Sequence, residues 1–394
     1  MAELKECVLV DGVRTANCRA HAAKGWLRNL RPDELLTHVY KALFERNPQV
    51  KPEEVEAVFC GTANQTGMQN DIARLGWLAS GLPVSVPTNG VNQQCPSAMA
   101  CIEHAARAIM SGEGDIYIAS GVEDMQNVPM AMGMDFPPRI AEYFNPADLP
   151  MGATAEKTVE TLGITREDTE LLAYHSHIRA RDARDAGKFK DEIVPIKGLD
   201  ENGQEVVVDR DQWIRDNPSI EQMAQMKPVF KPDGLVTAAT SSPLTTGAAA
   251  ILFMSRDKAD ELGLSYRLKY GGGVMAGYDP TLMGMSAAAA CRKLLDRKGL
   301  TVDDIDVFEL NEAFGSVVLA VLRDLGIEEN APLKKTNLWG GALALGHPLG
   351  QSGARMVITM NNIMKTDLPD AKRGVAMLCG GFGNGNASLW EKVE

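Results

Sequence analysis

The sequence predicts an α/β fold made of two similar halves, with a long insertion in the first half. Three observations support this prediction. Short apolar strands alternate with helical patterns, the same order of patterns recurs about 250 residues later, and a loop-rich segment interrupts only the first copy. With 394 residues, the chain is long enough for two or three domains and a sizeable core.

Each copy begins with a helical pattern and continues with a strand that has an acidic start. A turn, a second helix, a second strand and a closing strand follow in the same order. In the first copy these elements cover residues 35–44, 54–61, 90–95, 98–110, 116–120 and 247–253; in the second they cover 287–295, 304–311, 341–347, 354–364, 375–379 and 385–390. Because several ordered segments match, a chance likeness between two α/β halves is the weaker explanation.

The insertion lies between the second strand and the closing strand of the first copy. It starts with a proline-rich, loop-like stretch and continues with a charged helix expected at about residues 167–186, which places His175 and His177 on a solvated helix. The predicted division of the chain therefore has three parts. They are an N-terminal half at residues 1–121 plus 247–265, an inserted domain at 122–246, and a C-terminal half at 266–394.

Composition excludes several classes of protein. The formal charge of −12 argues against nucleic-acid binding, and no apolar run approaches the roughly 18 residues of a membrane span. The first residues mix charges and predict no targeting signal, and seven cysteines without framework spacing predict reduced thiols, so we expect a cytoplasmic protein. Cysteine and histidine spacing predicts no metal site, and the glycines at 271–277 and 380–385 lack dinucleotide-binding spacing, which excludes bound NAD or FAD.

Cys95 and His347 occupy equivalent places in the two copies, each expected at a strand-to-helix junction. If an approximate twofold axis relates the halves, these side chains face each other across it. Pro96 fits the first helical position, so we expect Cys95 at a helix N-terminus, where the helix dipole lowers the pKa of a thiol. Other cysteines are expected to be small buried residues: Cys7, Cys18, Cys60 and Cys101.

Cys379 ends the second strand of the second copy. The glycines that follow it form either a simple tight turn or a row of N–H groups that lines an oxyanion hole.

At these residues the sequence resembles the thiolase family, and the resemblance covers essentially the whole chain. The matching blocks are residues 91–95 (VNQQC), 311–314 (NEAF), 346–353 (GHPLGQSG) and 379–385 (CGGFGNG). The resemblance implies the duplicated five-layer αβαβα thiolase fold, with the insertion as the loop domain that holds coenzyme A. It implies a homodimer or homotetramer, and it leaves open whether a hydratase/dehydrogenase subunit docks on it.

The resemblance also implies a set of catalytic roles. Cys95 is expected to be the nucleophile, His347 the base that activates Cys95 and later the CoA thiol, and Cys379 the acid/base at the acetyl Cα carbon. Asn311 is expected to hold a water that forms one oxyanion hole with His347. The N–H groups of Cys95 and Gly381 would form the other. These roles fit carbon–carbon cleavage, which generates an enolate that needs charge stabilisation and a proton donor.

Substrate contacts follow from the same resemblance, with coenzyme A as a substrate and no permanently bound cofactor. The pantetheine arm is expected to contact Ser242, Ala238 and Phe314. The adenine is expected near Arg215, although this arginine also fits a solvated charge. Further substrate contacts are expected at Met151 and Met283.

Several positions depart from the common family pattern and place the local pocket shape in question. These are Pro96-Ser97-Ala98 after the nucleophile, Gln351 in place of a cysteine, and Thr246 in place of an aspartate. Short-chain members often have a histidine before the methionine at 151, where this chain has Pro150. This difference favours a 3-ketoacyl-CoA thiolase of β-oxidation.

Three alternatives remain for comparison. The nearest is an acetoacetyl-CoA thiolase that condenses two acetyl-CoA molecules. A decarboxylating ketoacyl synthase is disfavoured by Cys379 in its glycine-rich turn, and a non-catalytic acyl-CoA-binding subunit is disfavoured because all four expected catalytic side chains are present.

Overall fold

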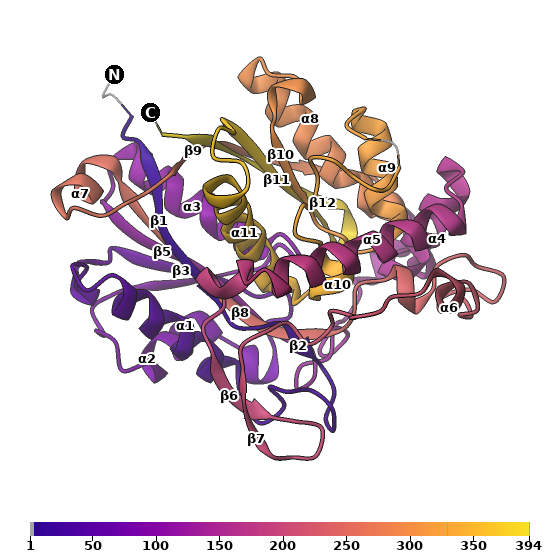
Figure 1. Ribbon diagram of the computed structural model, residues 1–394, viewed down its shortest axis with the longest axis horizontal. Helices are drawn as coiled ribbons and strands as arrows, with labels where there is room; N and C mark the ends of the chain where they lie inside the picture. Colours follow the sequence, from indigo (N-terminus) through magenta and orange to yellow (C-terminus); the bar gives the residue numbers. More distant parts are fainter. Residues whose placement is uncertain (1–3, 329, 394) are drawn as a thin grey trace.

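A computed structural model describes residues 4–328 and 330–393. Residues 1–3, which contribute to the prediction of no targeting signal, lie outside the described part. The described residues form one ten-stranded sheet and a separate two-stranded hairpin (Figure 1). The main path of the large sheet runs in the order β4 (Thr88–Val91), β3 (Ala57–Gly61), β5 (Ile116–Asp124), β8 (Thr245–Ser255), β1 (Cys7–Arg14), β9 (Leu268–Gly277), β12 (Asn384–Lys392), β11 (Arg373–Gly380) and β10 (Val307–Leu310). The short β2 (Cys18–Arg19) pairs with β8.

The two ends of this sheet have the same topology, which confirms the predicted repeat. In the first half β3 and β5 are parallel, and β8 is antiparallel to β5. In the second half β10 and β11 are parallel, and β12 is antiparallel to β11. The halves meet where β1 pairs with β9 through Val8 opposite Lys269 and Leu9 opposite Leu268, a join that the repeat comparison did not identify.

The strand equivalent to β4 is nearly absent from the second half. Among the described residues, an isolated bridge between Phe308 and Thr336 is what stands in its place. Asn337, which has a φ of 50°, uses its side chain instead of a strand backbone: its Oδ1 accepts from the Leu310 N–H and its Nδ2 donates to the Leu310 carbonyl. His347 follows a short helix, α10 (Ala342–Leu345), two residues after its end. The prediction that a strand precedes His347 is therefore wrong.

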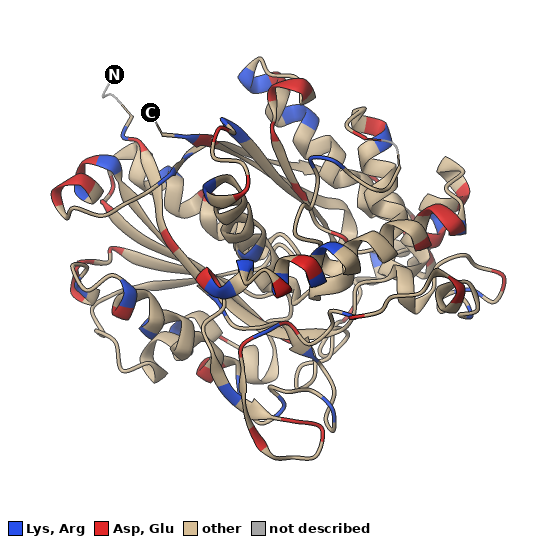
Figure 2. Ribbon diagram, viewed as in Figure 1, with Lys and Arg blue, Asp and Glu red and all other residues tan. Residues whose placement is uncertain are grey.

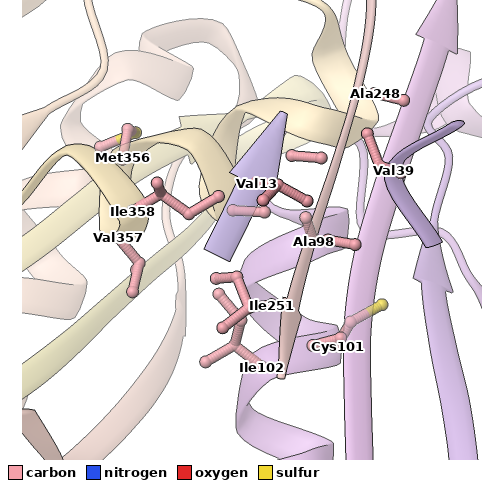
Figure 3. Packing of buried hydrophobic residues seen from close by; sticks show 14 of the residues in the cluster. Val13, Val39, Ala98, Cys101, Ile102, Ala248, Ile251, Met356, Val357 and Ile358 are labelled. Carbon is pink, nitrogen blue, oxygen red and sulfur yellow. The ribbon is translucent and has the colours of Figure 1, made fainter. Parts of the chain in front are cut away.

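The helices and the strands of the two halves stack in five layers, with helices on both outer faces and in the middle. The outer layers are α1 (Pro32–Arg46) with α2 (Ile72–Ala79), and α8 (Ser286–Lys298) with α9 (Gly315–Leu325). Between the halves lie α3 (Ser97–Ser111) and α11 (Ser352–Thr366), which contact each other and strands of both halves. Their residues are buried on most sides, as expected of helices enclosed by sheets. Figure 3 shows Ile102 of α3 and Ile251 of β8 close together, with Val13 of β1 and Ile358 of α11 in the same cluster.

The insertion leaves the sheet at the end of β5 and returns at the start of β8, its antiparallel neighbour. It contains α4 (Met151–Leu162), α5 (Arg166–Asp185), the hairpin of β6 (Ile196–Leu199) and β7 (Glu205–Val208), and α6 (Ile220–Ala224). The short α7 (Arg256–Glu261) follows β8. The predicted domain boundaries at residues 121 and 247 stay predictions. None of the helices in the described ranges is both long and apolar enough to cross a bilayer.

The charged helix predicted at residues 167–186 is confirmed as α5, and Figure 2 shows arginine and acidic residues along it. The predicted solvation is wrong for His177, which is buried. One face of α5 packs against the protein through Leu172, Ala173, Ser176, His177 and Ala180. This spacing of three to four residues is that of an amphipathic helix, and the density of charges on the other face concealed it.

Candidate active site

Cys95 lies in a tight turn between β4 and α3. The residue before it, Gln94, has a φ of 58°, and the Ser97 N–H donates to the Gln94 carbonyl at 3.0 Å. The helix begins at Ser97 with Pro96 as its N-cap, so Pro96 lies one position earlier than predicted. Cys95 thus directly precedes the cap of a helix whose first turn is buried.

The Cys95 thiol is fully enclosed, and burial raises its pKa above the ordinary value. The nearby Cys379 sulfur adds to this rise, whereas the Gly381 N–H, which donates to the Cys95 sulfur, opposes it. The prediction of a lowered thiol pKa from the helix position is therefore wrong for the resting site, since desolvation outweighs the dipole and the N–H donor. Cys95 rests as a neutral thiol.

Cys379 lies one residue before the end of β11, opposite Gly385 of β12. Burial raises the pKa of its thiol to about 12. The following turn reverses the chain with Phe382 at a φ of 64° and approaches the Cys95 turn closely. A side chain at Gly380 would collide with the ring of Pro96. Glycine at 380 is thus what allows the two cysteine-bearing turns to meet.

His347 lies in the loop between α10 and α11, buried to 2% exposure. Its Nε2 is 3.3 Å from Asn311 Nδ2, and its Nδ1 is 2.6 Å from Ser352 Oγ. Its backbone N–H donates to Thr245 Oγ1 at 3.2 Å. Burial, with a smaller contribution from the positive charge of Arg355, lowers the pKa of the imidazole to about 3. His347 therefore rests neutral.

Asn311 follows β10, and its N–H donates to the Met377 carbonyl of β11 at 3.1 Å. Within the described residues, its Oδ1 is buried and has no hydrogen-bond partner. The next residue, Glu312, is a buried carboxylate that accepts from Ser176 Oγ and from the Leu343 N–H. This carboxylate fixes the segment that carries Asn311 to the insertion and to α10.

The loop of His347 is held against the first half by a second buried carboxylate. Glu123, at the end of β5, accepts from the N–H groups of Gly350 and Ala63, both at 2.8 Å. Glycine is required at 350 because a Cβ there would lie 2.6 Å from the Cα of Thr62. The carboxylate and this close approach bring the His347 loop to the half of the molecule that carries Cys95.

Because two histidines are buried in their neutral form, we expect the free energy of unfolding to fall in acid. The folded-state pKa values of His347 and His177, about 3 and about 4, lie below the ordinary 6.5, so the unfolded chain binds more protons as the pH falls through this range. Stability is then highest above about pH 6.5. Between pH 7.5 and 5, each histidine is expected to account for ~2 kcal/mol of lost unfolding free energy.

Urea unfolding of His177→Asn at the two pH values is the measurement. The variant should lose about 2 kcal/mol less than the parent between them. His21, an exposed histidine, supplies the matched control His21→Asn, which should keep the parental pH dependence. An equal pH dependence in His177→Asn and the parent would contradict the expectation.

A cavity of about 300 Å³ lies in the insertion, and Leu343 of α10 also lines it. Its other lining residues include Arg215 and Ala238, together with Trp213 and His177. The Arg215 N–H donates to His177 Nδ1 at 3.4 Å, and this contact links the segment that carries Arg215 to α5.

The remaining predicted substrate residues lie beside the start of α9. The Ser242 N–H donates to the Ala313 carbonyl at 2.9 Å, and the neighbouring Ser241 forms an isolated antiparallel β-bridge with Phe314. Phe314 and Met283 belong to one buried cluster, against which Met151 at the start of α4 packs. The predicted contacts thus separate into a cavity-lining group and a group inside this cluster.

Three residues near these sites were not predicted. The ring of Phe230 packs edge to face on Phe314 with centroids 5.9 Å apart, and it covers Gly152 of α4. His177 lines the cavity, and Ser352 contacts His347. The apolar spacing along α5 could have located His177. Ser352 lies within the block 346–353, but its role depends on the geometry of the turn, and nothing local distinguishes Phe230, whose contacts come from distant segments.

Comparison with known proteins agrees with this architecture. Residues 7–257 match the family model of the thiolase N-terminal domain, and residues 267–392 match that of the thiolase C-terminal domain. A Marinobacter nauticus protein named 3-ketoacyl-CoA thiolase is 44% identical, covering 99% of this chain and 99% of its own length. A protein of the same name from Aeromonas hydrophila subsp. hydrophila is 43% identical, and the match covers 99% of this chain and 100% of the relative. The crystal structure of the Bacillus anthracis acetyl-CoA acetyltransferase, 34% identical, covers 100% of both chains with a TM-score of 0.89. The chain belongs to the thiolase family.

Proposed function

We propose that this protein is an acyltransferase that cleaves 3-ketoacyl-CoA with coenzyme A, releasing acetyl-CoA and an acyl-CoA shortened by two carbons. One observation carries the proposal: the buried Cys379 sulfur lies close enough to raise the pKa of the buried Cys95 thiol, the Gly381 N–H donates to the Cys95 sulfur, and Asn311 contacts His347. A nucleophile, a base, a second acid/base and hydrogen-bond donors are the groups that this reaction needs. The names of the relatives support the same reaction.

In the first half-reaction the Cys95 sulfur attacks the 3-keto carbon while its proton passes to His347 Nε2. The N–H donors and His347 stabilise the negative charge that develops on oxygen. The C2–C3 bond then breaks, and its electrons form the enolate of acetyl-CoA. Cys379 protonates C2 of this enolate, so acetyl-CoA leaves and the shortened acyl group remains on Cys95 as a thioester.

In the second half-reaction coenzyme A removes the acyl group. The proton on His347 restores the Cys379 thiol, and the neutral imidazole then takes the proton of the incoming CoA thiol. Attack of the CoA sulfur on the thioester carbon expels Cys95, which regains its proton from His347. The same groups run the reverse condensation, so the direction depends on concentrations.

The preferred substrate is proposed to be a 3-ketoacyl-CoA of fatty-acid β-oxidation. Relatives that are 42–44% identical are named 3-ketoacyl-CoA thiolase, and Pro150 caps α4 where short-chain members often have a histidine. The test is CoA-dependent thiolysis of purified protein with 3-ketoacyl-CoA substrates of increasing chain length. Cleavage of medium and long chains supports the proposal. Activity confined to acetoacetyl-CoA would support the rival condensing enzyme instead.

Coenzyme A is proposed to bind with its adenine end in the cavity beside Arg215 and its pantetheine arm past Ala238 and Ser242 towards Phe314. The insertion at 122–246, which interrupts the N-terminal half at 1–121 plus 247–265, then serves as the CoA-binding loop domain, and residues 266–394 form the C-terminal half. This path is supported by the fact that Arg215 and Ala238 line the same cavity.

Arg215→Ala is expected to raise the KM for CoA about fivefold while kcat changes less than twofold, because the contact is made equally in ground and transition states. Steady-state thiolysis at varied CoA concentration measures both constants. Arg210→Ala is the matched control, since Arg210 stacks on Trp26 instead of lining the cavity. An unchanged KM for CoA in Arg215→Ala would place the adenine elsewhere.

The protein is proposed to act as a homo-oligomer in the cytoplasm. β4 ends the sheet with an open edge, and α2 beside it exposes Leu75 and Leu78, followed by Val84 at 73% exposure. A second copy can pair the same edge around a twofold axis and cover these side chains. Light scattering should give a dimer or tetramer. The cysteines of the described residues are free thiols, which fits a reducing compartment.

A further inference from the structure

Ser352 is the first residue of α11 and is buried to 1% exposure. Its Oγ lies 2.6 Å from His347 Nδ1 and 2.8 Å from the Pro348 carbonyl oxygen, to which it is positioned to donate. The carbonyl can only accept a hydrogen bond, whereas the hydroxyl can donate one and accept others. When the Ser352 hydrogen goes to Pro348, the short contact to His347 requires the proton of the imidazole to be on Nδ1.

The other ring nitrogen completes the network. With the proton on Nδ1, Nε2 has a free lone pair, and Asn311 Nδ2 at 3.3 Å is its donor. This distance is at the long end for a hydrogen bond, so a reacting thiol can displace the amide. The opposite arrangement, with Ser352 donating to Nδ1 and the proton on Nε2, would leave no lone pair on Nε2 to accept the proton of Cys95.

We propose that Ser352 is a positioning residue that holds His347 in the tautomer with its lone pair on Nε2. The proposal rests on the proposed function, because it assigns the group that keeps the catalytic base ready. In a buried site no bulk water replaces a lost acceptor, so without Ser352 the Nδ1–H is left unsatisfied and the ring is free to change tautomer. Ser352 acts through His347 and need not contact the substrate.

The charged groups near His347 are held by partners other than Ser352. Arg355, one turn further along α11, is paired with Glu309 of β10 at 3.0 Å. Glu123 of β5 holds the loop through Gly350. The thiols of Cys95 and Cys379 are the other titratable groups of the proposed site. A change in pH dependence in a Ser352 variant therefore reports on the Ser352–His347 contact.

Ser352→Ala is expected to lower kcat for thiolysis by roughly 10- to 100-fold, the usual effect of removing the partner that orients a functional histidine. The KM values should stay within about threefold of the parent, because binding groups are untouched. Ser352→Thr keeps a hydroxyl at the same place and should retain most of the activity. Ser80→Ala is the matched control. Ser80 is also buried, and its hydroxyl donates to the carbonyl of Gly76, four residues earlier, at 2.7 Å. Ser80 has no part in the proposed site.

A second measurement does not depend on thiolysis. Alkylation of Cys95 by iodoacetamide, with Cys95→Ala as the blank, follows the transfer of its proton to His347. In Ser352→Ala the alkylation rate at neutral pH should fall at least tenfold, whereas the rate at alkaline pH, where a larger fraction of the thiol ionises without the help of His347, should change less. A merely structural loss would lower the rate at both pH values alike.

The tautomer itself is read from the ¹⁵N chemical shifts of His347 in protein labelled with ¹⁵N-histidine, assigned with His347→Gln. The parent should show a protonated Nδ1. A parent with a protonated Nε2, or Ser352→Ala with parental kcat and parental alkylation profile, would overturn the proposal. If the parent cleaves no 3-ketoacyl-CoA, the proposed function fails, and the chemical shifts and alkylation rates still decide the role of Ser352.

Discussion

Cys95→Ala is expected to lower kcat/KM for thiolysis by about four orders of magnitude or more, because no other group can carry the acyl thioester. The fold should persist, because a small apolar side chain replaces a buried thiol whose hydrogen bonds are to the backbone N–H groups of Gly381 and Cys95. Thiolysis assays with a long-chain 3-ketoacyl-CoA measure the loss. Mass spectrometry of protein incubated with acyl-CoA should find an acyl adduct on the parent and none on the variant.

Cys101→Ala is the matched control for this experiment. Cys101 lies six positions further on, within helix α3, whose N-terminus follows Cys95, and is also fully buried. Its substitution removes the same sulfur from the core and should leave kcat within about twofold. Comparable losses in both variants would mean that packing of α3, and not covalent catalysis, explains the effect at Cys95. Full activity of Cys95→Ala would refute the proposed mechanism.

Arg14→Met is expected to destabilise the protein by about 3–5 kcal/mol, the usual cost of removing one partner from a buried ion pair. Arg14, on β1, is fully buried and binds Asp211 through two hydrogen bonds of 2.7 and 2.9 Å and Glu192 through one of 2.8 Å. Methionine leaves two buried carboxylates without their cation. Thr359 and Asn362 still donate to Glu192, so part of its hydrogen bonding survives.

Urea unfolding followed by tryptophan fluorescence at pH 7.5 measures this effect. Arg139→Met is the control, because the Arg139–Glu142 pair is 3.6 Å apart and both side chains are mostly exposed. Its loss should cost less than about 1 kcal/mol. The two acids that Arg14 binds belong to the insertion, so Arg14→Met is also expected to loosen the wall near Arg215 and raise the KM for CoA. Equal stability of Arg14→Met and the parent would contradict this interpretation.

The repeated fold could be read from the sequence because its signals are local. Strands such as β3 and β10, and helices such as α3 and α11, are each marked by a few neighbouring residues, and their order alone identifies the duplication. The β1–β9 junction was not found, since pairing between strands more than 250 residues apart leaves no mark in either segment. The reduced counterpart of β4 was missed for a similar reason. There, the side chain of one residue, Asn337, replaces strand hydrogen bonds.

The candidate site shows the same division. The sequence by itself determined the residue types: the thiols of Cys95 and Cys379, the imidazole of His347, the amide of Asn311 and the glycines between them, in motifs that resemble the thiolase family. It also determined their places at the ends of strands and the starts of helices, apart from the short helix α10 that precedes His347.

Only the tertiary structure decided the state of these groups. Position at a helix N-terminus favours a thiolate, but enclosure between the two halves raises the pKa of Cys95 and lowers that of His347, so both rest neutral. Burial of His177 and the contact of Ser352 with His347 were decided in the same way. The physical reason is that desolvation and hydrogen-bond partners depend on every segment packed around a group, whereas a sequence motif specifies only the chain on either side of it.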